Sequence, residues 1–241
     1  MPGGAYSALS GMQTRLEELD RIAGDLANIG TPGYKIGRAG TQTAERESFG
    51  AALDSAIDVV PGQVRIDFTP GTIATTGRDL DVAIDGKGFF VVETEAGDRY
   101  TRSGNFTRRS DGVLATTHGE PVLGEAGEIK LGTGEVRIES NGTVKTGGVV
   151  VGQLRVVEFD DAENLIRESG ARFLAADGAE PHTAERTQVI AGSLEGSNAS
   201  VVDLMTRLTE VSRGFESMQR GVGTMQNELD GRAISELLGR A

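Results

Sequence analysis

The sequence predicts an α+β fold in which a central all-β domain lies between two terminal helices that pair as a coiled coil. Apolar residues near both ends of the 241-residue chain recur in alternating steps of three and four, which is the period of a coiled-coil seam. The stretch between them is rich in glycine and in short alternating runs typical of strands. The predicted domains are an N-terminal helix over 1–30, an extended linker over 31–78, a β-rich domain over 79–196 and a C-terminal helix over 197–241.

The N-terminal helix is predicted over residues 5–29. Its seam consists of Leu9, Met12, Leu16, Leu19, Ala23 and Leu26. The helix ends before Pro32, because proline lacks a backbone N–H and moves the residue before it out of helical geometry. Residues 34–78 have only weak periodicity. We therefore expect an extended linker, and linkers of this length usually serve a function.

The β pattern begins at Leu80, Val82 and Ile84, which alternate with polar or small residues. Asn141-Gly142 is a strong hairpin signal. Aromatic residues make up only 5% of the chain, so we expect a thin, aliphatic core. Asp79, Asp81 and Asp85 are expected on the solvated face of a strand rather than in a calcium loop. Further strands are predicted at 89–93, 99–102, 112–116, 128–131, 135–139, 143–145, 149–159, 172–174 and 188–194.

The C-terminal helix is predicted from Ser200 to about residue 238. Ser200 followed by Asp203 resembles a capping box. We expect this helix to supercoil with the N-terminal one. Glycines at 214, 221 and 223 indicate close approach of neighbouring helices, or a helix that forms only when packed. The seam of this helix consists of Leu204, Leu208, Val211, Phe215, Met218, Val222, Met225 and Leu229.

The composition argues against several classes of function. A net charge of −12 is unfavourable for binding nucleic acid or an anionic membrane, and no apolar run is long enough for membrane insertion. Without cysteine, thiolate catalysis and cysteine-based zinc sites are excluded. His118 and His182, the only histidines, lie in turn-like sequences and are expected at the surface. We therefore expect no catalytic residue, no cofactor and no metal site.

Three blocks of sequence resemble a known family. Residues 25–35 read DLANIGTPGYK. A second block reads LDVAIDGKGFFV at 80–91, YTRSGNF at 100–106 and DGVLATTHGEPVL at 111–123. A third reads LEGSNASVV at 194–202. In this order they resemble the axial proteins of the bacterial flagellum, the rod and hook family. Most members have an asparagine pair where this chain has Gly24 and Asp25. The motif residues are Leu26, Ala27, Asn28, Thr31, Gly33, Tyr34 and Lys35.

The resemblance implies a structural subunit of the basal-body rod, not an enzyme, in the proximal rod or, as the alternative, in the distal rod. Family members polymerise helically, with copies of themselves and with other rod proteins, into a drive shaft that crosses the periplasm and transmits torque. The resemblance also implies the flagellar type III export apparatus as a partner and export without a cleaved signal peptide. The first residues fit this expectation, because they lack a charged segment followed by an apolar one.

Two other classes of function fit the sequence less well. A periplasmic glycan-cleaving enzyme would need a pair of carboxylates framing a cleft, and the sequence has no such signature. A trimeric adhesin stalk usually carries a signal peptide and a membrane anchor, and neither pattern is visible here.

Overall fold

The computed structural model describes residues 3–39, 64–176, 178–184 and 187–238. The chain forms two compact units. One contains the two long helices, and the other contains residues 27–38 and 65–199. Within the described residues, neither helix has a stretch apolar and long enough to span a membrane. The predicted α+β class is confirmed. Residues 40–63 of the predicted linker lie outside the described residues, and the domain boundaries stay a prediction.

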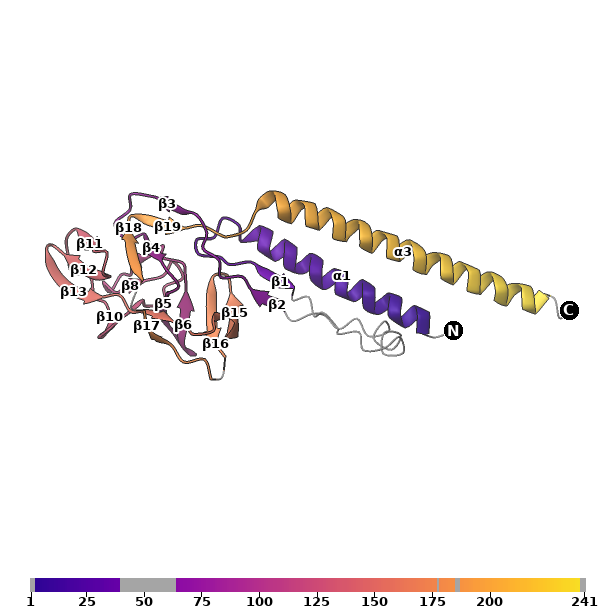
Figure 1. The fold of residues 1–241 in the computed structure, drawn as a ribbon, viewed down its shortest axis with the longest axis horizontal. Helices are drawn as coiled ribbons and strands as arrows, with labels where there is room; N and C mark the ends of the chain where they lie inside the picture. The colour runs from indigo at the N-terminus through magenta and orange to yellow at the C-terminus, as the bar shows by residue number, and fades with distance from the viewer. Residues whose placement is uncertain (1–2, 40–63, 177, 185–186, 239–241) are drawn as a thin grey trace. The chain divides into compact units, whose positions relative to one another are not determined.

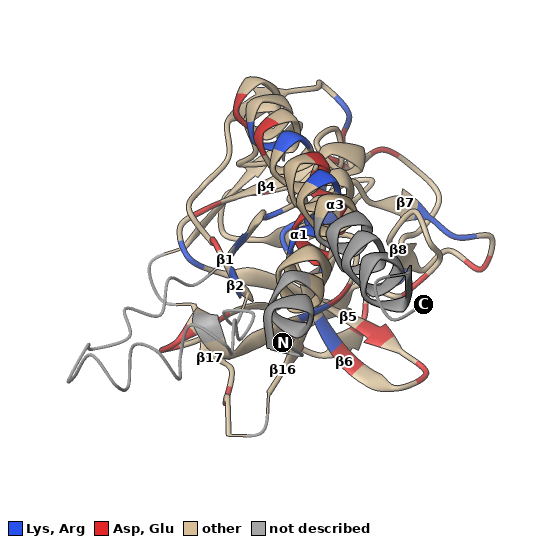
Figure 2. Ribbon diagram, turned by 90° about the vertical axis from the view of Figure 1, so that its right-hand side faces the viewer, with Lys and Arg blue, Asp and Glu red and all other residues tan. Residues whose placement is uncertain are grey.

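The helical unit is built from α1 (Gly3–Ala27) and α3 (Val201–Leu238), which lie side by side (Figures 1 and 2). A Cβ atom placed on Gly11 of α1 would lie 3.4 Å from the sulfur of Met218 in α3, so glycine allows a close approach here. Ser200 caps α3 as predicted, since its Oγ accepts a hydrogen bond from the N–H of Asp203 at 3.4 Å.

Charged residues of both signs lie along the two helices (Figure 2). In α1, Arg15 pairs with Glu18 at 2.8 Å and Arg21 pairs with Asp25 at 3.5 Å. The close approach predicted at the glycines of α3 is not seen within the described part of the subunit. A Cβ atom placed at 214, 221 or 223 would meet no atom outside its own helix within 4 Å. Packing of these glycines against other chains stays a prediction.

The strands of the structure are short, as the glycine content suggests. The strands are β1 (Gly37–Ala39), β2 (Val64–Ile66), β3 (Ile73–Thr75), β4 (Val82–Asp85), β5 (Phe89–Thr94), β6 (Gly97–Thr101), β7 (Thr107–Arg108), β8 (Leu114–Ala115), β9 (Leu123–Gly124), β10 (Gly127–Glu128), β11 (Val136–Ile138), β12 (Thr143–Thr146), β13 (Val149–Gln153), β14 (Val156–Glu158), β15 (Leu165–Ser169), β16 (Arg172–Ala175), β17 (His182–Thr183), β18 (Gln188–Ala191) and β19 (Ser193–Glu195). A 3-10 turn, η1 (Ala162–Asn164), precedes β15.

The largest sheet has the strand order β15-β16-β6-β5-β14-β17, and its strand β5 faces two cores. Phe90 and Val92 point into one apolar cluster, while Phe89 and Val91 point into a second. Both faces are buried because successive side chains of a strand point to opposite sides. The sheet thus separates two hydrophobic layers within the β unit.

The predicted aliphatic core is confirmed for the larger cluster, in which Phe90 and Phe106 are the only aromatic residues among the buried members, but the second cluster is largely aromatic. Phe89 packs edge-to-face on Phe68 and on Phe159, with ring centroids 5.4 and 5.9 Å apart, and Phe173 joins the same cluster. The few aromatic residues of the chain are concentrated where one face of the sheet is covered. Composition gives their number but not their clustering.

The predicted hairpin is confirmed, since β11 and β12 pair antiparallel around Asn141-Gly142 and Gly142 has a φ of 81°. Two predicted strands are each divided in the structure. The run at 149–159 forms β13 and β14, and the run at 188–194 forms β18 and β19 on either side of Gly192. Gly192 has a φ of 65°, a left-handed conformation that interrupts a strand.

Asp81 corrects the expectation of a solvated aspartate row. Asp79 and Asp85 are exposed, but Asp81 is only 1% exposed. Its carboxylate accepts a hydrogen bond from Thr76 Oγ1 at 2.7 Å and lies 3.4 Å from the guanidinium of Arg78. A local hydrogen bond to one oxygen and a cation near the other thus replace the water that this carboxylate loses on burial.

Candidate functional site

The predicted seam of α1 is only half covered in the single subunit. Leu9 is 58% exposed, Leu16 is 47% exposed and Ala23 is also exposed. Successive members of this set are seven positions apart, so the three side chains form one stripe along the helix. The other three seam positions are half-buried: Met12, Leu19 and Leu26. Ile22, which the seam does not include, is fully buried. We call Leu9, Leu16 and Ala23 the open stripe.

The predicted seam of α3 is covered more completely. Leu204 and Val211 are buried. The next positions are half-buried: Leu208, Phe215, Met218 and Val222. The side chains of Met225 and Leu229 lie outside the described residues. Sequence reasoning missed the exposed apolar residues at the start of α3, which are Val201, Val202 and Met205. Their signal is that Val201 continues the seam by one step of three, while Val202 and Met205 are apolar residues outside the heptad positions.

The three family-like sequence blocks meet at a buried ion cluster of Lys35, Arg102 and Glu195. The ammonium of Lys35 donates to Glu195 Oε1 at 2.5 Å, and Arg102 Nη1 lies 3.5 Å from Glu195 Oε2. The three side chains are 0%, 3% and 1% exposed. Of the three, only Lys35 was predicted as a site residue. Arg102 and Glu195 lie in the second and third blocks, and their position there is the signal that could have identified them.

Backbone groups complete the solvation of this cluster. Lys35 also donates to the carbonyl of Thr69 at 2.8 Å, and the N–H of Gly71 donates to Glu195 Oε1 at 3.0 Å. Burial lowers the pKa of Lys35, and Glu195 acts in the opposite direction. Burial likewise lowers the pKa of Arg102. Both cations have therefore lost hydrating water on burial, and the negative charge of Glu195 offsets this loss.

Gly33 and Tyr34, the motif residues beside Lys35, also contact the rest of the β unit and stabilise the same region. Gly33 has a φ of 68°, and a Cβ atom placed on it would lie 2.4 Å from the carbonyl carbon of Arg102. Only glycine fits both constraints. Its N–H donates to the carbonyl of Glu195 at 2.7 Å. Tyr34 is buried, and its hydroxyl accepts a hydrogen bond from Arg167 Nη1 at 2.7 Å while the guanidinium lies over the ring.

Of the remaining motif residues, Leu26 and Ala27 end α1, and Asn28 and Thr31 lie in the turn that follows it. Thr31 donates through Oγ1 to Asn28 Oδ1 at 3.3 Å and through its N–H to the Asn28 carbonyl at 2.9 Å. Ala27, the last residue of α1, is exposed.

Asn198 joins the chain that leaves α1 to the chain that enters α3. Its Oδ1 accepts from the N–H of Ile36 at 2.9 Å, and its Nδ2 donates to the carbonyl of Asp67 at 2.7 Å. Together with Lys35 and Glu195, it binds three segments that are far apart in sequence. The cluster therefore links the segment that follows α1 to the segment that precedes α3.

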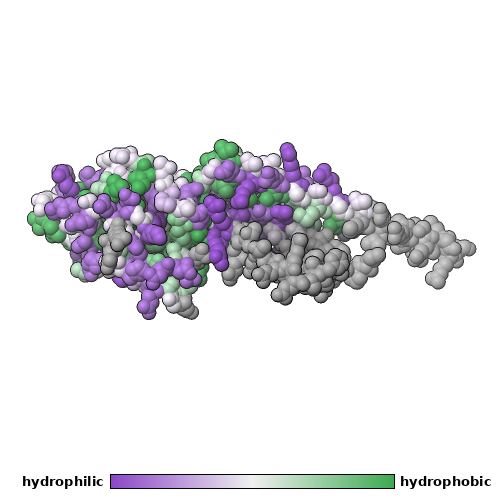
Figure 3. Space-filling model, viewed as in Figure 1, coloured by the Kyte–Doolittle hydropathy of each residue, from purple (hydrophilic) through white to green (hydrophobic). Residues whose placement is uncertain are grey.

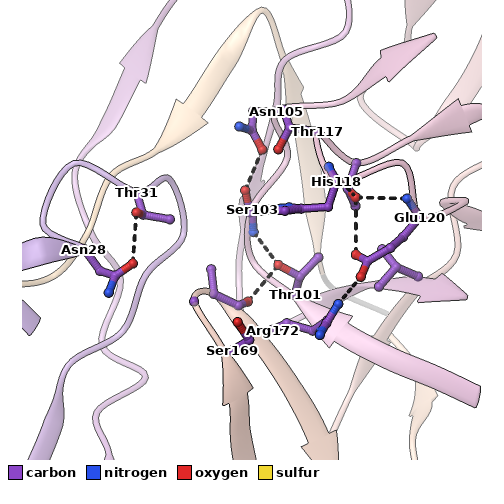
Figure 4. Close-up of a pocket in the computed structure, with 14 residues that line it drawn as sticks. Asn28, Thr31, Thr101, Ser103, Asn105, Thr117, His118, Glu120, Ser169 and Arg172 are labelled. Carbon is purple, nitrogen blue, oxygen red and sulfur yellow. Dashed lines mark hydrogen bonds and ion pairs between the residues drawn. The ribbon is translucent and has the colours of Figure 1, made fainter. Parts of the chain in front are cut away.

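A polar pocket of about 490 Å³ lies beside the motif turn, between Asn28 and Thr31 on one side and the β strands on the other (Figure 4). Its side chains already pair with one another. Ser103 donates to Asn105 Oδ1 at 2.7 Å, and Glu120 forms an ion pair with Arg172. His118 and His182 are exposed, as predicted.

Two family profiles match the chain. One, described as "Flagellar hook protein FlgE/F/G D1 domain", matches residues 83–146, and the other, described as "Flagellar basal body rod FlgEFG protein C-terminal", matches residues 190–235. The flagellar basal-body rod protein FlgF of Caulobacter vibrioides is 33% identical, and the alignment covers 100% of this chain and 99% of that protein. The chain belongs to the flagellar basal-body rod family. The predicted family is thereby confirmed.

Other members of the rod family give the same result. FlgF of Salmonella typhimurium is 32% identical over 95% of both chains. The rod protein FlgG of Bacillus subtilis is 32% identical over 91% of this chain and 93% of its own. Glu195, Lys35 and Gly33 thus lie within an alignment that extends along the whole chain, and the second profile includes Glu195 together with most of α3.

Proposed function

We propose that this chain is a structural subunit of the flagellar basal-body rod, in its proximal part, that polymerises helically with copies of itself and with other rod proteins and transmits torque. The observation that carries the proposal is the similarity to FlgF over the full length of both chains. We assign it no catalytic role, in line with the names of its relatives. The similarity to FlgG makes a distal rod subunit the alternative.

In this proposal α1 and α3 pair as a coiled coil through their seams. The approach of Gly11 to Met218 supports this pairing. The open stripe of α1 then remains for a neighbouring subunit, since Leu9 and Leu16 are about half exposed. Burying apolar surface stabilises a contact by roughly 25 cal/mol per Å². Repeated along a helical polymer, such contacts resist twisting and separation.

The remaining parts of the proposal come from the sequence pattern and from the family resemblance. They are a coiled-coil pair of 1–30 with 197–241, a linker over 31–78 that contributes to subunit contacts, and a β domain over 79–196. They also include export through the flagellar type III apparatus without a cleaved leader and a location in the rod where it crosses the periplasm.

The open stripe of α1 provides a direct test of the proposed assembly. Leu16→Asp places a charge where a neighbouring helix would pack, but it leaves the folded monomer intact because Leu16 is already 47% exposed. Gln13→Asp is the control, since Gln13 is exposed on α1 and lies outside the seam. Each variant would replace the native gene in the source bacterium. We expect that Leu16→Asp is exported but absent from purified rods, with loss of swimming.

The control should assemble and support swimming. Normal rods containing Leu16→Asp would show that this stripe is not a subunit contact. Absence of the native chain from purified basal bodies would contradict the proposed function itself.

A further inference from the structure

The β unit has an exposed edge strand without a charged residue. Residues 68–77, which contain β3, form an uncharged run in a chain of net charge −12, and every residue from 72 to 79 is exposed. Among the described residues β3 pairs only with β19. Charged side chains are a usual protection of open edges against other strands. This edge lacks that protection.

The backbone of β3 has hydrogen-bonding groups available on its open side. The carbonyl of Thr72 accepts from Gly196, and the N–H of Thr76 donates to Gly192. Alternate residues of an antiparallel strand direct their backbone groups to opposite edges. Ile73 and Thr75 therefore direct their N–H and C=O groups away from β19. The edge is also firmly held, because Gly71 donates to Glu195 of the buried cluster.

A second edge with the same character lies on β13. Residues 146–154 are also uncharged, and Val149 and Val150 are 67% and 58% exposed. Strand β13 is the terminal strand of the sheet β11-β12-β13. Its far end is covered, because the N–H of Glu125 donates to the carbonyl of Gln153 at 3.0 Å, so the open part of this edge is at residues 149–151. Figure 1 places β3 and β13 at different positions on the β unit, and Figure 3 shows apolar surface near each of them. The uncharged strand β18 is different, because its Val189 N–H donates to Ser140.

We propose that β3 of one copy of this chain pairs with β13 of the next copy. The absence of charge on both edges favours a second copy as the occupant, because two chains of net charge −12 repel each other least where neither presents a carboxylate. A contact between two different surface patches is heterologous and can continue as an open helix. The proposal rests on the proposed rod assembly and adds to it a specific contact. Two short strands are insufficient alone, so the contact acts together with the helices.

Cysteine cross-linking tests this contact, because the native chain has no cysteine. Thr75→Cys and Val149→Cys would be introduced together, and each alone as a control. Both sites are exposed and do not contribute to the cores. We expect mild oxidation of assembled rods to give a ladder of multimers only for the double variant. Assembled rods without a ladder, a disulfide within one copy, or a cross-link to another axial protein would each overturn the proposal.

Amide exchange of the native chain provides a test that does not depend on cysteine variants. In the polymer, the Ile73 and Thr75 amides should exchange about tenfold more slowly than in the free subunit, as expected for a newly formed hydrogen bond. Ala74, which pairs with Leu194 in β19, is the internal reference. Unchanged exchange at Ile73 and Thr75 in intact polymers would overturn the contact but leave the rod assignment standing. If purified rods do not contain this chain, the proposed rod function itself is refuted.

Discussion

Replacing Glu195 by glutamine should strongly destabilise the β unit. Glu195 is 1% exposed and is the anion shared by Lys35 and Arg102. Glutamine keeps the shape and one acceptor oxygen but removes the charge. Two buried cations then lack a counter-ion, and breaking a buried pair in this way costs about 3–5 kcal/mol. The expected effect of Glu195→Gln on the free energy of unfolding is a decrease of this size.

Replacing Lys35 by methionine should cost less, although it breaks the same ion pair. Arg102 and Glu195 then remain as a pair of opposite charges. The lost stability comes mainly from the hydrogen bonds that Lys35 donates. One of these bonds goes to the Thr69 carbonyl, which loses this donor in the variant. Thr69 is exposed, so water can replace this donor, and the lost hydrogen bond to the charged Glu195 contributes about 1.5–3 kcal/mol. The structure therefore predicts an order, with Glu195→Gln more destabilising than Lys35→Met.

Urea unfolding of the full-length monomer measures both variants. Near-ultraviolet circular dichroism of tyrosine is a suitable signal, because Tyr34 and Tyr100 are both buried in the β unit. Glu139→Gln is a matched control. Glu139 also pairs with a lysine at 2.5 Å, but these two side chains are 40% and 31% exposed, so water screens the pair and it should contribute less than about 1 kcal/mol. Equal losses for Glu195→Gln and Glu139→Gln, or a larger loss for Lys35→Met, would refute the reasoning.

Three smaller changes probe the motif loop and a surface turn. Gly33→Ala should destabilise the subunit by about 1–3 kcal/mol in the same assay, because of the positive φ and the contact with Arg102; unchanged stability would contradict this. Tyr34→Phe should cost about 1 kcal/mol through the lost hydrogen bond from Arg167, whereas no loss would show that this bond has no net effect. Hydrogen bonds from Arg109 lower the pKa of Asp111 from 3.8 to about 2, so its contribution to stability is present above pH 3.8 and is lost as the pH falls toward 2. Carboxyl NMR titration should show this value and its rise in Arg109→Gln; a pKa near 3.8 in the native chain would contradict it.

Local sequence patterns predicted those elements whose signals are local. Heptad steps predicted both helices, and Asn141-Gly142 predicted the hairpin between β11 and β12. Strand β3 was missed, because it is three residues long and its partner β19 is more than a hundred residues away. No window of sequence contains that pairing. The interruption at Gly192 was missed for another reason, since a single left-handed residue does not change the apolar pattern around it.

The ion cluster could be predicted only in part for the same physical reason. Lys35 was identified through the motif that follows α1, but periodicity treats a charged residue as a surface residue. Lys35, Arg102 and Glu195 are separated widely in the chain, and their burial is possible only because they meet. The blocks that resemble the rod family located all three residues. Their mutual contact required the three-dimensional structure.

The place of the motif directly after α1 has a mechanical reason. The chain leaves α1 through Lys35 and enters α3 shortly after Glu195 and Asn198, so both connections to the helices pass through one buried cluster. Pulling the two connections apart would separate Lys35 from Glu195 and expose each charge to an environment without its partner. Because a buried pair resists separation more strongly than an exposed one, the cluster holds the two connections at a fixed spacing. In the proposed rod, a load applied to the helices would therefore reach the β unit through Lys35 and Glu195 as well as through the peptide backbone.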